Sequence, residues 1–150
     1  MKVLVADDDS VSRRLLENYL QKWGYDVTEA SNSAEAWRLF EQDEYPIVLS
    51  DWMMPELDGP ELIQRIRAST RSNYVYTILL TVRSQKEDLV KGMEAGADEF
   101  ISKPFDKDEL RVRIRAGERI IRLEMALKEQ NRALREAQAG LPPPADIAGP

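Results

Sequence analysis

Short apolar runs and longer stretches of helical period alternate five times along most of this 150-residue chain. The segments fall at about residues 2–6, 25–30, 46–50, 76–80 and 98–101, and several are rich in Val, Ile and Leu, whereas residues 25–30 are weakly apolar and alternating, as in an edge strand. Such runs are typical of strands buried on both faces of a parallel sheet, with a helix between each strand and the next. The alternation therefore predicts one α/β domain with helices on both faces of a five-stranded sheet.

Four helices are predicted between these strands from apolar residues spaced three and four apart. They cover about residues 10–23, a segment with Ser33 as its N-cap, a segment after the Asp58-Gly59 turn, and about residues 84–95. Gly24 and Gly96 follow the first and the fourth of these helices as stop signals.

The last helix is predicted to begin at Asp106 or Asp108, either of which can cap it, and to continue to about Gln138. Leu110 and Ile114 can pack on the sheet, but beyond Ile121 the helix should overrun a sheet of five strands. A heptad seam, with spacings of four and three, runs along it through Ala116, Ile120, Leu123, Leu127, Gln130, Leu134 and Ala137. We expect a domain over residues 1–122, a coiled-coil extension over 123–138 and a disordered Pro-rich tail over 139–150.

Composition excludes several kinds of chemistry. The chain has no Cys and no His, so it has no disulfide, thiolate nucleophile or imidazole base. A net charge of −6 argues against nucleic-acid binding, which depends on Lys and Arg. No apolar run reaches the length of a membrane span, and the residues after Met1 do not resemble a signal peptide. We therefore expect a cytoplasmic protein that binds neither nucleic acid nor membrane.

Polar residues gather where the predicted strands end. Asp7 and Asp8 follow the first strand, Asp51 the third, Thr81 the fourth and Lys103 the fifth. The acids after the first strand could simply cap the next helix, but in open parallel sheets ligands bind at the carboxyl ends of the strands. Carboxylates at close range favour a hard cation such as Mg²⁺. A carboxylate beside Mg²⁺, opposite a Lys and a Thr hydroxyl, suits phosphoryl transfer to the carboxylate.

Four sequence segments occur in an order that resembles a CheY-like receiver domain of a two-component response regulator over roughly residues 1–122. They are VLVADDDSVSRRLL, VLSDWMMPELDGPELIQRIR, ILLTVRS and GADEFISKPF. The resemblance implies a flavodoxin-like (βα)5 fold, a doubly wound parallel sheet with strand order 2-1-3-4-5. It implies a phospho-accepting signalling domain and not a turnover enzyme. An aspartyl phosphatase would need a second acid where Met53 stands.

Carried over position by position, the resemblance implies that Asp51 accepts a phosphoryl group from a histidine kinase or a phosphotransfer protein. Mg²⁺ would be bound by Asp8, by Asp51 and by the backbone carbonyl of Met53, and Asp7 would act through water. Lys103 would contact the phosphoryl group.

The resemblance also names a switch. The hydroxyl of Thr81 would move toward the phosphoryl oxygens, and the ring of Phe100 would follow it. Pro104 resembles the cis-proline that follows the Lys in this family.

Three residues depart from the pattern. Val82 stands where Ala or Gly is usual, and its bulk is expected to narrow access to the phosphoryl pocket. Met53 and Arg83 occupy positions that influence attack by water on the acyl phosphate, and neither side chain can orient that water. A long-lived phosphoryl state is the resulting hypothesis.

The output is expected through the surface of the fourth helix, the fifth strand and the last helix, and through homodimerisation along that last helix. Glu99 and Arg113 stand where related receivers place charges that bridge a dimer. The helix also resembles the connector before diguanylate cyclase domains. Two alternatives remain, a receiver-plus-stalk fragment of such a regulator and a non-switching coiled-coil adaptor. The downstream target is not indicated.

Overall fold

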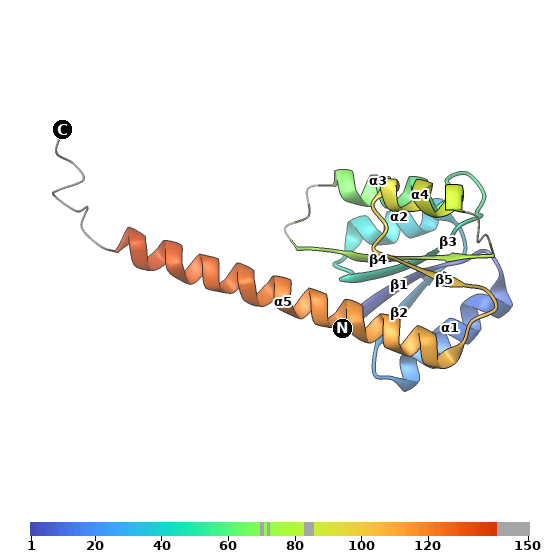
Figure 1. Ribbon diagram of the computed structural model, residues 1–150, viewed down its shortest axis with the longest axis horizontal. Helices are drawn as coiled ribbons and strands as arrows, with labels where there is room; N and C mark the ends of the chain where they lie inside the picture. The colour runs from blue at the N-terminus through green and yellow to red at the C-terminus, as the bar shows by residue number, and fades with distance from the viewer. Residues whose placement is uncertain (70, 72, 83–85, 141–150) are drawn as a thin grey trace.

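Five parallel strands form one sheet with the order β2-β1-β3-β4-β5 in the computed structural model, which describes residues 1–69, 71, 73–82 and 86–140 (Figure 1). The strands are β1 (Lys2–Ala6), β2 (Asp26–Ala30), β3 (Ile47–Asp51), β4 (Tyr76–Thr81) and β5 (Glu99–Ser102). The predicted flavodoxin-like fold and strand order are confirmed. Pro46 precedes β3 instead of opening it, and its carbonyl accepts a hydrogen bond from the backbone N–H of Tyr76.

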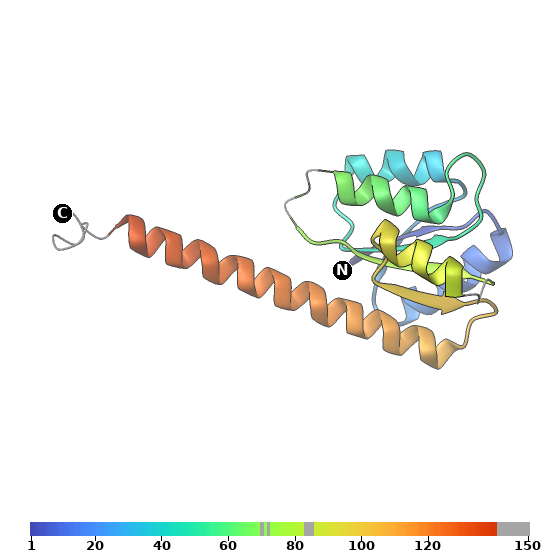
Figure 2. The same cartoon turned by 45° about the horizontal axis from the view of Figure 1, so that its top comes forward.

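Five helices cover the two faces of the sheet. They are α1 (Ser10–Lys22), α2 (Ser33–Gln42), α3 (Gly59–Ala68), α4 (Lys86–Ala95) and α5 (Lys107–Ala139). Helices α1 and α5 lie on one face and α2, α3 and α4 on the other (Figures 1 and 2). The predicted start of the fourth helix, at residue 84, lies outside the described residues.

Strand register decides which side chains meet at the carboxyl edge of the sheet. Ala6 of β1 is paired with Ser50 of β3, so the residues that follow them, Asp7 and Asp51, reach the edge side by side. The chain moves from β1 to β2 on one side of the sheet and then to β3 on the other side of β1. The connections therefore diverge above β1 and β3, which is where open α/β sheets form their ligand crevice.

Side-chain caps explain where the helices begin. The Asp9 carboxylate accepts a hydrogen bond from the backbone N–H of Val11 at the start of α1, so the last acid of the triplet Asp7-Asp8-Asp9 is indeed a cap. Asp106 caps α5 in the same way. Ser33 was expected to cap α2, but the cap is Asn32, whose side chain accepts from the N–H of Glu35. The Ser33 hydroxyl instead bonds to the loop after β3, at Pro55 and Leu57.

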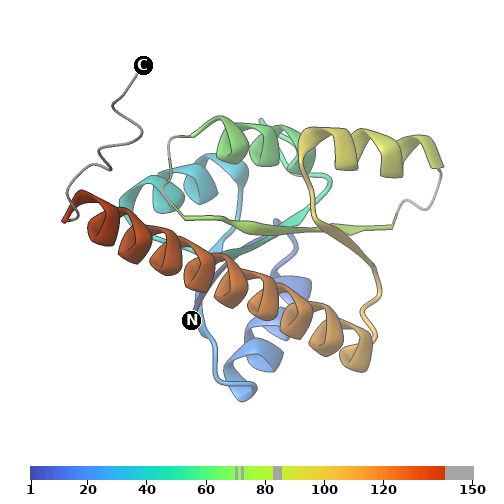
Figure 3. The same ribbon diagram turned by 60° about the vertical axis from the view of Figure 1, so that its left-hand side comes forward.

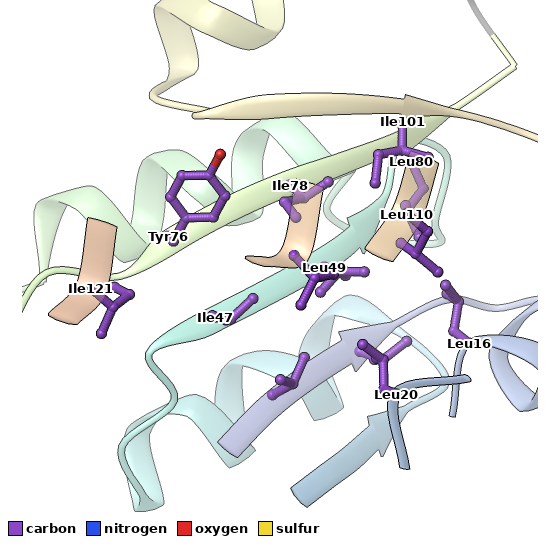
Figure 4. Packing of buried hydrophobic residues seen from close by; sticks show 13 residues of the cluster. Leu16, Leu20, Ile47, Leu49, Tyr76, Ile78, Leu80, Ile101, Leu110 and Ile121 are labelled. Carbon is purple, nitrogen blue, oxygen red and sulfur yellow. The ribbon is translucent and has the colours of Figure 1, made fainter. Parts of the chain in front are cut away.

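The core on the α1/α5 face joins both helices to the middle of the sheet. Its fully buried members include Leu16 and Leu20 from α1 and Leu110, Ile114 and Ile121 from α5, packed on Ile47, Leu49, Ile78 and Leu80 (Figure 4). At Gly117 the helix approaches the sheet closely. A Cβ atom there would lie 2.5 Å from Cδ1 of the buried Tyr76 ring.

The long last helix is confirmed. Ile121 is its last buried residue, and every residue from 122 to 140 is exposed. Because each helix runs antiparallel to the strands, α5 passes the amino-terminal edge of the sheet and continues away from it (Figure 1). Residues 141–150, which hold most of the predicted disordered tail, lie outside the described residues. Within the described part of the chain, no helix combines the length and the apolarity needed to cross a membrane.

The close approach at Gly117 leads to a stability prediction. Gly117→Val should lower the free energy of unfolding by about 1–3 kcal/mol, because the added methyl groups would overlap the Tyr76 ring in a packed core. Ala126→Val, at an exposed position of the same helix, controls for the helix propensity of valine. Urea unfolding followed by circular dichroism compares the two variants. Equal losses of stability would show that the contact with Tyr76 is unimportant.

Candidate functional site

Three carboxylates meet at the carboxyl edge of β1 and β3. Asp7, Asp8 and Asp51 each present an oxygen atom, and these three atoms all lie within 4.8 Å of one another. Asp7 is completely buried, the Asp51 side chain is 13% exposed, and Asp8 faces solvent. The cluster is therefore open on one side, so that an ion or a phosphoryl group can approach Asp51 and Asp8 from water.

Lys103 brings a positive charge into this cluster from the end of β5. Its Nζ atom lies 3.0 Å from Oδ2 of Asp7 and 3.1 Å from Oδ2 of Asp51. Its backbone N–H donates to the carbonyl of Thr81 at 3.0 Å, which ties the residue to the end of β4. The peptide bond between Lys103 and Pro104 is cis, as the resemblance implies.

Asp7 is held more firmly than its neighbours. Its Oδ1 atom accepts from the backbone N–H of Asp9 at 3.0 Å, while Oδ2 accepts from Lys103. Its carbonyl accepts from Nη1 of Arg13 at 2.8 Å. Both carboxylate oxygens of Asp7 are already hydrogen-bonded, so Asp7 holds Lys103 in place at the buried side of the cluster. Asp8 and Asp51 are the more accessible carboxylates. Sequence reasoning missed Arg13, since an Arg in the first turns of an amphipathic helix carries no distinctive signal.

Burial and charge change the proton affinity of the site. Burial raises the pKa of Asp51 to about 6, the charge and hydrogen bond of Lys103 oppose this rise, and the neighbouring Asp7 adds to it. For Lys103, burial lowers the pKa, but its contacts with Asp7 and Asp51 outweigh that effect and raise the pKa above 10.5. Two carboxylates thus share one ammonium, and a cation at the open side would further favour the ionised form of Asp51.

Thr81 and Phe100 lie on the strands beside the cluster. Thr81 is almost completely buried at the end of β4 and is paired with Ser102 of β5. The Phe100 ring is half-buried and stacks on the ring of Trp52, with centroids 6.4 Å apart and planes 28° apart. Trp52 directly follows Asp51, so an aromatic contact links the acid loop to β5.

The Phe100 ring packs directly against Gly92 of α4, where the lack of a side chain leaves space for it. A Cβ atom at Gly92 would lie 2.7 Å from Cε1 and Cζ of that ring. Neither Trp52 nor Gly92 was identified from the sequence. Their roles depend on the packing of α4 against β5, to which helical periodicity gives no guide.

Two of the three residues that depart from the family pattern are exposed to solvent. Met53 is 56% exposed and Val82 is 76% exposed. Arg83 lies outside the described residues. Glu99 and Arg113, which were expected to bridge a dimer, form an ion pair with each other inside one chain, with Nη1 and Oε2 3.0 Å apart.

Comparisons with known proteins agree with this geometry. Residues 3–115 match the family model of the response regulator receiver domain. The chemotaxis protein CheY1 of Helicobacter pylori is 34% identical over 116 residues, which cover 76% of this chain and 94% of that protein. The transcriptional regulatory protein SrrA of Staphylococcus aureus is 36% identical over 77% of this chain and 46% of its own length. The chain thus spans less than half the length of that regulator.

Solved structures give the same picture. The receiver domain of the Francisella response regulator 1452 is 34% identical, with a TM-score of 0.72, over 77% of this chain and 94% of that chain. A probable two-component system response regulator/GGDEF domain protein is 30% identical, with a TM-score of 0.76, over 81% of this chain and 50% of that chain. The second match extends further along this chain than the first.

The raised pKa of Asp51 predicts a pH-dependent stability in the absence of divalent ions. Folding takes up a proton between the ordinary pKa of 3.8 and about 6, so the free energy of unfolding falls as pH rises through this window. Asp51→Asn should then be more stable than the wild type above this window by about 1–3 kcal/mol, at ~1.4 kcal/mol per unit of pKa. The difference should vanish at the acid end of the window.

Chemical unfolding from acid to neutral pH measures this difference. Asp106→Asn, which removes a negative charge elsewhere and keeps a good N-cap, is the control and should follow the wild-type profile. If the profiles of Asp51→Asn and wild type ran parallel throughout, Asp51 would not have a raised pKa.

Proposed function

The chain belongs to the response regulator receiver domain family, and on that premise we propose that Asp51 accepts a phosphoryl group from a histidine kinase or a phosphotransfer protein in a Mg²⁺-dependent reaction. The observation that carries the proposal is the gathering of Asp7, Asp8 and Asp51 around the Lys103 ammonium. The chain would act as a phospho-accepting signalling domain and catalyse only its own phosphorylation and dephosphorylation. We place this signalling in the cytoplasm.

The donor set suits Mg²⁺. Three hard carboxylate oxygens lie close together and one side of the cluster is open to water, which matches the preference of this ion for a few carboxylates and retained waters. Asp8 and Asp51 would bind it directly with the Met53 carbonyl, and Asp7 through water. When bound, Mg²⁺ supplies positive charge that offsets the negative charge on the phosphoryl oxygens.

Asp51 performs the transfer. A carboxylate oxygen of Asp51 attacks phosphorus, the bond between phosphorus and the donor's imidazole nitrogen breaks, and the product is an acyl phosphate. The nitrogen keeps the bonding electron pair. Asp51 must be ionised for this attack, so neutralisation of the cluster by a cation also favours the reactive form. The absence of His from the chain is consistent with a donor imidazole on the partner.

Lys103 and Thr81 receive the new phosphoryl group. The Lys103 ammonium already lies within hydrogen-bond distance of Asp51, so it can transfer this contact to a phosphoryl oxygen without a large movement. The Thr81 hydroxyl would move to another phosphoryl oxygen. Phe100, which is stacked on Trp52 and packed against Gly92, would follow and alter the surface of α4, β5 and α5.

Dimerisation through α5 forms the output in the same proposal. The exposed apolar residues of the seam support it, including Leu123, Leu127 and Leu134. The ion pair between Glu99 and Arg113 is intramolecular here, so a dimer bridged by these charges would have to exchange it for contacts between chains. That exchange couples the α4-β5-α5 surface to the dimer.

A second candidate is that the receiver and stalk form part of a larger regulator, such as a diguanylate cyclase. The match to a response regulator/GGDEF domain protein favours it, since that match covers 81% of this chain but half of the other. In this case the phosphoryl acceptor is unchanged and the stalk transmits its state. A non-switching coiled-coil adaptor is disfavoured, because the acids, Thr81 and Lys103 are all present.

Acetyl phosphate tests the acceptor. Incubation with acetyl phosphate and Mg²⁺ should add the mass of one phosphoryl group to the wild type and none to Asp51→Ala. Asp9→Asn, an acid of the same triplet whose replacement keeps the N-cap of α1, should be phosphorylated like the wild type. Intact mass spectrometry reads the result. Equal labelling of Asp51→Ala, or full labelling of the wild type in excess EDTA, would refute the proposal.

The residues that depart from the family pattern predict a slow loss of the phosphoryl group. Met53 offers no carboxylate or amide to orient a water molecule, so the phosphorylated protein should persist well beyond seconds in Mg²⁺. Met53→Asn should shorten its lifetime, and Met53→Leu should leave it unchanged; at 56% exposure neither variant disturbs the core. Loss of label from the wild type within seconds would overturn the hypothesis.

A further inference from the structure

We infer that α5 pairs with α5 of a second copy of this chain as a parallel, in-register, two-stranded coiled coil, with Gln130 facing the partner's Gln130. The inference rests on the proposed dimerisation and adds its polarity and its register. Three observations carry it: the exposure of the stalk, the separation of faces around the helix, and the residues at and beside the seam.

No side chain of the stalk, defined here as residues 122–139, is buried, and the stalk contacts its own domain through a hydrogen bond from Lys128 Nζ to Asn73 Oδ1 at 2.9 Å. Leu123, Leu127 and Leu134 are 63%, 53% and 55% exposed. Its eighteen residues extend about 27 Å at 1.5 Å per residue, and Figure 3 shows it projecting beyond the sheet. A solitary helix of this length is marginally stable in water, so packing of its apolar seam against another helix would stabilise it.

Three different faces of α5 have three different environments. The domain-facing side carries Leu110, Ile114, Gly117 and Ile121, all of which are buried. At 3.6 residues per turn, the seam lies roughly a third of a turn from that side. The side of α5 away from the seam carries ion pairs of Arg122 with Glu118 and of Arg132 with Glu129 and Glu136, and this side adjoins the domain-facing side. The domain therefore does not cover the seam, and a second helix can lie along it.

The spacing assigns heptad positions to the seam. Ile120, Leu127 and Leu134 occupy position a, and Ala116, Leu123, Gln130 and Ala137 occupy position d. Gln130 is thus the polar residue of an otherwise apolar seam. Its amide carries donors and acceptors that need partners once a second helix covers it.

Gln130 distinguishes between the arrangements that the apolar residues allow. In an antiparallel pair, position d faces position a of the partner, and every residue at a is Ile or Leu, so the amide would face a hydrocarbon. In a parallel pair displaced by one heptad, Gln130 would face the partner's Leu123 or Ala137. The parallel in-register pair alone places the two amides together, where each can donate to the other. A single polar residue at a core position is a known determinant of register.

The charges beside the seam select the same arrangement. From Ala116 onward, the charged residues at the flanking positions are Arg119 at g and Glu124 at e, and both are exposed. In a parallel in-register pair, position g faces position e of the partner's next heptad, so Arg119 meets the partner's Glu124 twice by symmetry. In an antiparallel pair g faces g and e faces e, which gives no pair of opposite charges.

This polarity has a structural consequence. A parallel stalk places the two domains at the same end and brings the two Ala139 residues together at the other end. A change in how the domains pack against each other would then reach the end of the stalk symmetrically.

Cysteine cross-linking tests the polarity, because the chain has no Cys and each variant carries one thiol. Leu123→Cys and Leu134→Cys, each alone, should form disulfide-linked dimers in a glutathione redox buffer, because facing d or a positions are close enough for a disulfide. An equimolar mixture of the two should give no mixed disulfide. Arg132→Cys, on the side of the helix away from the seam, is the matched exposed control and should remain monomeric on a non-reducing gel.

The outcomes separate this inference from the proposals it rests on. Sedimentation velocity with and without acetyl phosphate reports whether the wild type dimerises, and intact mass reports phosphorylation independently. A monomer in both states overturns the dimer and leaves the phosphoryl acceptor intact. A dimer that gives the mixed disulfide of Leu123→Cys with Leu134→Cys is antiparallel, and it overturns the polarity alone.

Gln130→Leu tests whether Gln130 selects the parallel arrangement. Removal of the amide should raise the thermal stability of the dimer and increase the yield of mixed Leu123→Cys and Leu134→Cys disulfide several-fold, because the antiparallel arrangement no longer leaves a polar group unpaired. If the Gln130→Leu dimer remained strictly parallel by this assay, Gln130 would not determine the arrangement.

Discussion

The Lys103 ammonium is held between carboxylates from two different strands, 3.0 Å from Asp7 and 3.1 Å from Asp51, and the site depends on this contact. Three carboxylates at this separation would repel one another without a cation. Lys103 lowers that repulsion while it joins the end of β5 to the ends of β1 and β3. The remaining negative charge lies on the open side, where Asp8 and Asp51 face water. Among the described residues, three carboxylates thus share one ammonium here, and this excess of negative charge suits the Mg²⁺ ion of the proposed function.

The two halves of helix α5 have different structural roles. Its first half completes the core, where Gly117 lets the helix approach Tyr76 and Ile121 closes the packed region. Its second half leaves the sheet at the edge opposite the acid cluster (Figure 1). Between these parts, Arg113 of α5 is paired with Glu99 of β5, the strand that carries Phe100 and ends beside Lys103. In the proposed function, the path from Asp51 to the stalk is thus short, and it runs through β5.

The residues of the proposed switch are packed against one another. Phe100 is half-buried against Gly92 and Trp52, and a larger residue at position 92 would overlap its ring. Trp52 is continuous with Asp51, so the aromatic stack joins the acceptor loop to the surface of α4 and β5. In the proposed mechanism, the ring would leave this position when Thr81 moves. That surface, and not the distant stalk, is the first to change on phosphorylation in the proposed mechanism.

The spacing of apolar residues, together with the Gly and capping residues at element ends, determined the five strands and the five helices. It also determined the position of the polar residues at strand ends. These features depend on local burial and on local turn chemistry. The fold family and the proposed acceptor, Asp51, followed from the resemblance that four sequence segments carry. Only the tertiary structure decided which groups touch. Asn32 caps α2 because Ser33 is bonded to the loop after β3, Glu99 pairs with Arg113 inside the chain, and Arg13 supports Asp7. These contacts join residues from separate elements, and the relative placement of elements is set by packing and strand register, which no local pattern encodes.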